Sequence, residues 1–262
     1  MTHHIRPEVC CPKTNFYSYE QFELDTPVVG IALRFDSKSR EIIVDLGDFT
    51  GIIPENEVCI GDFTYSRFSD IPYQISSVIG KKVRALVKGI SDDGTILLSR
   101  KASMLEAWDN LEEGTILQAK ITSIASFGIF IDIGNGITSY INKRDCSVTR
   151  YYDINKWFEI GDNTLIRIIE KNPVTFRISC SRKDAYPTVS ESKTVNVGDF
   201  LAAKVGKSPF LEGGYYCEIT PAITGIVDTQ KEFEEGAMIP VKVKSLRKNG
   251  ENIIGLKLAL IE

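Results

Sequence analysis

The sequence predicts an all-β chain made of three small barrels in tandem. Similar blocks recur along the chain at a period of roughly 75–85 residues, which is the length of one small barrel. Within each copy, strand-length runs alternate apolar and polar side chains and are separated by glycine, asparagine and aspartate turns. Helical periodicity is scarce, so clustered strands that close into barrels account for the pattern best.

The first copy covers residues 25–111 and follows a tail, residues 1–24, that shows no periodicity. Its strand signals lie at residues 41–47, 50–54, 79–83 and 96–101. Apolar side chains at helical spacing, from Met104 to Leu111, then predict a short linker helix over residues 102–111. Within this helix Trp108 is expected to pack against a barrel, and a ring offered to a ligand is the alternative.

The second copy covers residues 112–187 and the third covers residues 188–262. Between them lies a polar segment with proline and serine, Tyr186–Lys193, which is typical of a short linker. In the third copy, the runs Gly214–Ile219 and Ile254–Leu258 repeat the strand blocks of the first.

The stretch from Phe127 to Gly134 is the most informative in the chain. It alternates aromatic and aliphatic side chains and ends at Asp-x-Gly, so a strand can hold rings on one open face. Bases of a single-stranded nucleic acid stack on such rings, at about 1–3 kcal/mol per base. A second stretch, Phe176–Lys183, adds a strand with a guanidinium group and ends in two basic residues, Arg182 and Lys183, that can meet phosphates. Together they indicate a barrel that binds single-stranded nucleic acid.

The order and spacing of these motifs resemble those of the S1 RNA-binding domain family, a branch of the five-stranded OB barrels. The resemblance runs through five blocks: Gly114, Ile121, Phe127–Gly134, Gly161–Asp162 and Arg177–Lys183. It implies three tandem five-stranded OB-fold, S1-like barrels joined by short linkers. Residues 114–183 match motif by motif, whereas the other two copies match in architecture.

By this resemblance Phe127 and Phe130 form the platform on which bases stack. Residues three apart would face opposite sides of a regular strand, and the family places Gly128 at a local distortion that brings both rings to the surface. Inward packing of Phe130 as core is the alternative. Asn142 stands at the family's histidine and can hydrogen-bond a base edge, while Tyr140 is expected to supply a replacement ring.

Arg177 aligns with the RNA-contacting arginine of the family, which pairs with phosphate or stacks on a base. A solvent-facing strand arginine is the alternative. The family's aspartate shortly before this arginine is missing, because Asn172 and Pro173 occupy the turn, which is expected to loosen the fixing of Arg177. Lys183 is expected to neutralise a phosphate.

The long connection from Asp145 to Gly161 interleaves basic and aromatic residues, which suits single-stranded nucleic acid near the mouth of a barrel. Arg150 and Tyr151 are the preferred contacts in this loop. In the third copy, Tyr215 and Tyr216 are expected to make auxiliary RNA contacts at most.

The first copy lacks the residues of a reading face. Its two ring positions hold Arg40 and Ile43, Pro54 stands at the histidine position, and Thr95 stands at the arginine position. A barrel of this kind is expected to dock on a protein or to support its neighbour.

The charge is unevenly distributed along the chain. The net charge of −4 arises in residues 1–111, which carry −4, while residues 112–187 carry +1 and residues 188–262 carry −1. Local patches rather than the total set the affinity for nucleic acid. This balance nevertheless argues against strong, non-specific binding of duplexes.

No metal or other cofactor is expected, because free thiols in a disordered tail explain His3, His4, Cys10 and Cys11 better than a metal site does. His3 and His4 are the only histidines of the sequence, so a catalytic site of the Ser-His-Asp or Cys-His type is implausible and no catalytic residues are expected. No apolar run approaches the ~20 residues of a membrane helix, and the first residues do not resemble a secretory leader. The expectation is a cytoplasmic protein with no membrane partner.

The sequence therefore predicts a non-catalytic protein that binds single-stranded RNA, mRNA in particular, mainly through its second barrel. The family implies an association with translation or the ribosome. The rival hypothesis is a protein-interaction adaptor, whose first barrel docks on a ribosomal or transcription protein and whose RNA contact is weak.

Overall fold

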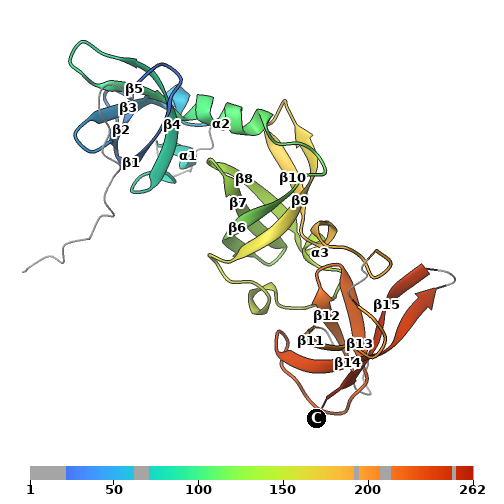
Figure 1. The fold of residues 1–262 in the computed structure, drawn as a ribbon. Helices are drawn as coiled ribbons and strands as arrows, with labels where there is room; N and C mark the ends of the chain where they lie inside the picture. Colours follow the sequence, from blue (N-terminus) through green and yellow to red (C-terminus); the bar gives the residue numbers. More distant parts are fainter. Residues whose placement is uncertain (1–21, 62–70, 192–194, 207–213, 250–251, 262) are drawn as a thin grey trace, which may run out of the picture. The chain divides into compact units, whose positions relative to one another are not determined.

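The computed structural model describes residues 22–61, 71–191, 195–206, 214–249 and 252–261 (Figure 1). Its strands form three closed five-stranded barrels, so the predicted fold class is confirmed. The chain divides into two compact units, residues 1–110 and residues 111–262, and the second unit holds two of the barrels. The expectations for residues 1–21, the histidines and adjacent cysteines included, lie outside the described residues.

The first barrel is the sheet β1-β2-β3-β5-β4 closed on itself. Its strands are β1 (Pro27–Asp36), β2 (Glu41–Asp45), β3 (Thr50–Pro54), β4 (Lys82–Ile90) and β5 (Ile96–Ser99). Strict alternation buries Ile42 and Ile53 inside the barrel and leaves Ile43 and Ile52 on its outer face. Between β3 and β4 lie η2 (Glu55–Glu57) and α1 (Tyr73–Ser76), and α1 adds Ile75 to the core.

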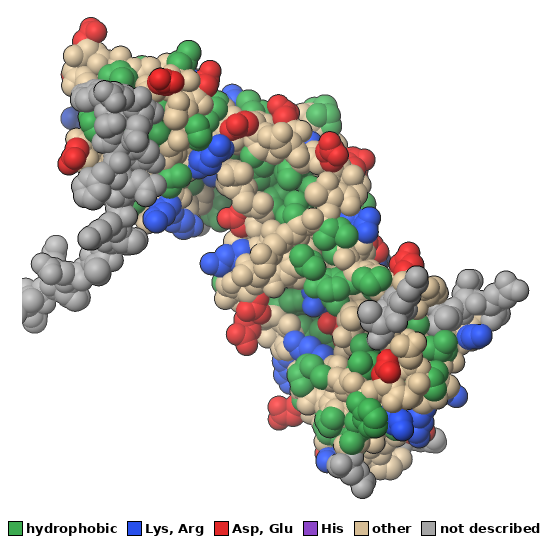
Figure 2. Space-filling view, viewed as in Figure 1, with side chains coloured by type: hydrophobic (Ala, Val, Ile, Leu, Met, Phe, Trp, Pro, Cys, Tyr) green, Lys and Arg blue, Asp and Glu red, His purple; other side chains and the backbone are tan. Residues whose placement is uncertain are grey.

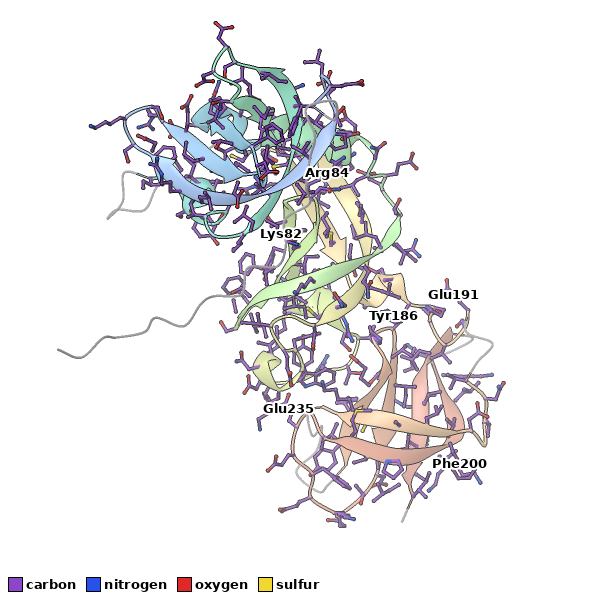
Figure 3. The ribbon with its side chains drawn as sticks, turned by 60° about the vertical axis from the view of Figure 1, so that its left-hand side comes forward. Lys82, Arg84, Tyr186, Glu191, Phe200 and Glu235 are labelled. Carbon is purple, nitrogen blue, oxygen red and sulfur yellow. The ribbon has the colours of Figure 1, made fainter. Side chains whose placement is uncertain are left out.

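The helix α2 (Arg100–Asp109) lies where the sequence predicts a short helix, and it packs beside β4 (Figure 1). Ser99 caps it, because the serine hydroxyl accepts a hydrogen bond from the Ala102 amide at 2.8 Å. Arg84 of β4 pairs with Glu106 of the helix at 3.2 Å (Figure 3). Trp108 is buried, so its ring serves packing.

The second barrel has the strand order β10-β8-β7-β6-β9. Its strands are β6 (Ile116–Ala125), β7 (Gly128–Gly134), β8 (Ile137–Asn142), β9 (Asn163–Asn172) and β10 (Arg177–Ser181). Three short helical turns complete it: α3 (Lys143–Cys146), η3 (Ile154–Lys156) and η4 (Lys183–Ala185). Fully buried isoleucines fill the interior, among them Ile121, Ile129, Ile131, Ile141 and Ile166.

The third barrel repeats the order of the first, β11-β12-β13-β15-β14. Its strands are β11 (Phe200–Val205), β12 (Tyr215–Thr220), β13 (Ile223–Val227), β14 (Met238–Asn249) and β15 (Asn252–Leu260). The core is built from small and branched side chains, including Val205, Cys217, Val241 and Leu256.

A charged interface joins the second and third barrels within the second unit. Arg182 and Glu218 form an ion pair at 3.4 Å, and both side chains are largely buried. Arg182 also donates hydrogen bonds to the Cys146 carbonyl at 3.0 Å and to the Thr164 hydroxyl at 3.1 Å. The ion pair with Glu218 links the two barrels, while the two hydrogen bonds lie within the second barrel and fix the Arg182 side chain there.

The described residues hold no group of three or more His, Cys, Asp or Glu side chains that could bind a metal ion. Within the same residues, no helix is long and apolar enough to cross a membrane. The four cysteines that the structure describes, Cys59, Cys146, Cys180 and Cys217, are all free and buried.

The buried thiol of Cys217 predicts a loss of stability in alkali. Burial raises the pKa of this thiol from its usual 9.0 to about 12, against an opposing hydrogen bond from the Gly206 amide. A pKa raised by folding stabilises the native state below pH 9, and this stabilisation is lost as the pH rises toward 12. We expect pulse alkylation of Cys217, read by mass spectrometry along a urea series, to show a lower unfolding midpoint at pH 10 than at pH 8. An equal or higher midpoint at pH 10 would contradict this.

Candidate nucleic-acid interface

Three aromatic rings meet on the outer face of the second barrel. Phe127 is 57% exposed and Phe130 is 39% exposed. Their ring centroids lie 6.4 Å apart, and the ring of Tyr140 lies 5.5 Å from the first and 5.2 Å from the second. We call Phe127, Phe130 and Tyr140 the ring cluster. Its two exposed rings offer flat apolar surface of the kind on which nucleic-acid bases stack.

The strand geometry explains how both phenylalanines reach the same surface. Phe127 lies in the turn between β6 and β7, before the strand alternation begins. Along β7, Ile129 and Ile131 point into the barrel, and Phe130 between them points outward. The hairpin turn that contains Phe127, rather than a distortion at Gly128, therefore brings both rings to the surface. The alternative in which Phe130 packs inward is wrong.

Gly128 is required because the ring of Tyr140 lies over its backbone. A Cβ atom at this position would approach the Tyr140 hydroxyl to 2.5 Å and the Ile141 carbonyl oxygen to 2.2 Å. The Tyr140 hydroxyl instead donates a hydrogen bond to the Phe127 carbonyl at 2.6 Å. Burial, followed by the neighbouring Cys146 and Asp145, raises the pKa of Tyr140. The tyrosine thus fixes the turn that presents Phe127.

Arg177 and Asn142 flank the ring cluster on neighbouring strands. Arg177 is exposed at the start of β10, two residues before Ser179, which pairs with Tyr140 of β8. Among the described residues, no hydrogen bond or ion pair engages its guanidinium group. Asn142 is exposed, and its side-chain oxygen caps α3 by accepting a hydrogen bond from the Arg144 amide at 3.0 Å. The amide NH₂ group of Asn142 remains as a donor.

The other predicted phosphate contacts differ in availability. Lys183 is half-buried, and its Nζ donates to Asp145 at 2.9 Å and to the Arg144 carbonyl at 3.1 Å, so a phosphate would compete with these partners. Arg150 is exposed in the loop after α3. Lys and Arg side chains are interspersed with Asp and Glu on the surface shown in Figure 2, in keeping with the near-neutral charge of this barrel.

Tyr151 is not at the surface, contrary to expectation. It is 7% exposed and stacks on the Trp157 ring with centroids 4.5 Å apart. Its hydroxyl donates to the Lys143 carbonyl at 3.2 Å. These contacts bury the ring of Tyr151 and anchor the loop to the barrel. The next residue, Tyr152, is exposed, at 64%.

In the third barrel, Tyr215 is partly buried against the core. Its ring meets Phe233 edge-on at 5.9 Å, and its hydroxyl accepts a hydrogen bond from the Phe233 amide at 3.2 Å. Tyr216 is half-buried on β12. Neither tyrosine forms a cluster comparable to that of the second barrel.

The second barrel matches a known family of domains. The model of the S1 RNA binding domain matches residues 110–183. These residues form an S1 RNA-binding domain. The S1 domain contains all five strands of the second barrel, the ring cluster and Arg177.

Beyond the S1 domain, the chain is homologous to small ribosomal subunit protein bS1 over 90% of its length. The protein of Staphylococcus aureus strain COL is 24% identical over 265 residues, and that of Staphylococcus saprophyticus is 26% identical over 260 residues. In both cases the match covers 63% of the relative, so the chain spans less than two thirds of the proteins it resembles.

Among solved structures, the chain is similar to a multidomain protein with nucleic acid binding domains from Streptococcus pneumoniae. The identity is 16%, and the match covers 91% of this chain and 74% of that one with a TM-score of 0.32.

Proposed function

We propose that the chain binds single-stranded RNA, mRNA in particular, chiefly through the S1 domain, and that it acts without catalysis in translation or at the ribosome. We place this activity in the cytoplasm. The observation that carries the proposal is the exposed ring cluster inside a domain whose family is described as RNA-binding. The homology to a ribosomal protein supports the setting.

In the proposed mechanism, Phe127 and Phe130 each take a base by stacking. Arg177, which lies on the same outer face, pairs with a phosphate or stacks on a third base. Asn142 donates to a base edge or a phosphate, and Arg150 and Lys183 neutralise neighbouring phosphates. Because stacking tolerates every base, the preference for RNA sequence should be slight.

Fluorescence anisotropy with a labelled RNA of about 12 nucleotides tests this proposal, since that length fits the site sizes of OB folds. Single-stranded DNA and duplex RNA of equal length serve as controls, at two salt concentrations. We expect the single strands to bind better than the duplex. The logarithm of affinity should fall with the logarithm of salt with a slope of about −0.7 per phosphate neutralised. Absence of binding at low salt, or equal binding of the duplex, would contradict the proposal.

A second candidate function is protein docking through the first barrel. Its outer face carries Ile43 directly paired with Ile52, beside the exposed side chain of Leu33, and no ring stands at the positions that stack bases in the S1 domain. Such an aliphatic surface suits a protein partner better than RNA. If Leu33→Glu abolished association with ribosomes while RNA affinity stayed unchanged, docking would be the function of this barrel.

A further inference from the structure

A single lysine connects the ring cluster to a further exposed aromatic residue, Tyr152. The backbone amide of Lys143 donates to the Phe127 carbonyl at 2.8 Å. The Nζ atom of the same lysine donates to the Tyr152 carbonyl at 2.6 Å. One lysine residue therefore bridges the backbone carbonyls of Phe127 and Tyr152, although these two residues are 25 positions apart in the sequence.

The surroundings of Tyr152 suit a nucleic-acid strand. Tyr152 is 64% exposed, and two exposed arginines, Arg144 and Arg150, precede it in the same connection. Lys143 lies between it and the ring cluster, with its Nζ on the Tyr152 carbonyl. An exposed ring among cations is the combination that holds a base and its phosphate in single-stranded sites.

The third barrel holds Tyr152 in place. The carboxylate of Glu235 accepts hydrogen bonds from the Tyr152 amide at 2.5 Å and from the Asp153 amide at 3.3 Å. Glu235 lies where the third barrel meets the loop of the second (Figure 3). The next residue, Gly236, has a φ of 89°, and a Cβ atom there would come within 2.6 Å of the Lys156 carbonyl. The contact is thus close and leaves no room for a side chain.

We propose that an RNA strand stacked on the ring cluster continues across Lys143 and stacks a further base on Tyr152. The third barrel contributes a positioning residue, Glu235, rather than rings of its own. This inference rests on the proposed function and adds to it the direction of the strand, toward the third barrel.

Two RNA lengths separate the contact at Tyr152 from the ring cluster. A tetranucleotide can occupy the ring cluster alone, and a 12-nucleotide strand can reach both places. In competition anisotropy we expect Tyr152→Ala to lower the affinity for the 12-nucleotide strand about tenfold and to leave the affinity for the tetranucleotide unchanged. Tyr152→Phe, which keeps the ring, should bind both strands as the unmodified protein does.

Glu235→Ala should also lower the affinity for the 12-nucleotide strand alone, and by less than Tyr152→Ala does. Glu234→Ala is the matched control, because Glu234 is the exposed neighbour whose side chain lacks these bonds in the described residues. The fluorescence of Trp157, measured in chains that carry Trp108→Phe, checks that each variant is folded.

If Phe127→Ala lowers the affinity for the 12-nucleotide strand but Tyr152→Ala does not, the proposed contact at Tyr152 is overturned and the proposed function stands. If neither strand binds the unmodified protein, the proposed function itself fails and the contact at Tyr152 fails with it. A loss of equal size for both strands in Tyr152→Ala would show a disturbed loop rather than a stacking contact.

Discussion

Phe127→Ala is expected to weaken the binding of a 12-nucleotide single-stranded RNA by about 1–3 kcal/mol, which is about 5- to 150-fold. Phe127 is the more exposed ring of the cluster, so it offers the larger face to a base. Phe130→Ala should have a similar or smaller effect. The two losses should not add, because the rings touch and each supports the other. Anisotropy titrations of both single variants and the double variant measure these losses.

Phe200→Ala is the matched control for this experiment. Phe200 is 67% exposed on β11 of the third barrel, so it is a phenylalanine of similar exposure that lies outside the ring cluster (Figure 3). We expect its loss to leave RNA affinity unchanged. An equal loss in Phe127→Ala and Phe200→Ala would mean that exposed rings contribute indiscriminately, and the ring cluster would then have no special role.

Arg182→Met should cost about 3–5 kcal/mol of stability in the second unit, because it leaves the buried Glu218 carboxylate without its partner. It also removes the donor that satisfies the Cys146 carbonyl. Urea unfolding followed by Trp157 fluorescence measures the loss. Trp108→Phe is introduced throughout, so that the signal comes from the second unit alone.

The double variant Arg182→Met with Glu218→Leu separates pairing from packing. Replacing both charges by apolar side chains of similar size removes the uncompensated charge, so most of the lost stability should return. A double variant as unstable as the sum of its single variants would contradict the account, and would place the contribution of Arg182 in its other hydrogen bonds.

The barrels could be predicted because their strands alternate strictly, as in β2, where Ile42 is buried and Ile43 faces out. The ring cluster could be predicted from the motif around Phe127 and from the position of Tyr140. The sequence predicted a strand distortion at Gly128, whereas the structure has a hairpin turn at Phe127. The spacing of side chains alone does not show where a strand begins or ends.

The loop after α3 could not be predicted in the same way. Adjacent tyrosines in an irregular segment follow no period, so nothing in the sequence says that Tyr151 is buried and Tyr152 exposed. The role of Glu235 was equally hidden, since its partners are backbone amides more than 80 positions earlier. Contacts between barrels depend on how the barrels dock, which a repeat pattern does not encode.

Photo-crosslinking tests the central claim most directly, because it reports which residues a bound RNA touches. A 12-nucleotide single strand carrying 4-thiouridine is irradiated in complex with the full chain, and the modified peptides are identified by mass spectrometry. We predict crosslinks at Phe127, Phe130 or Tyr140, and their loss when a duplex of the same sequence is used. Crosslinks confined to residues 25–111, or none at saturating RNA, would contradict the account.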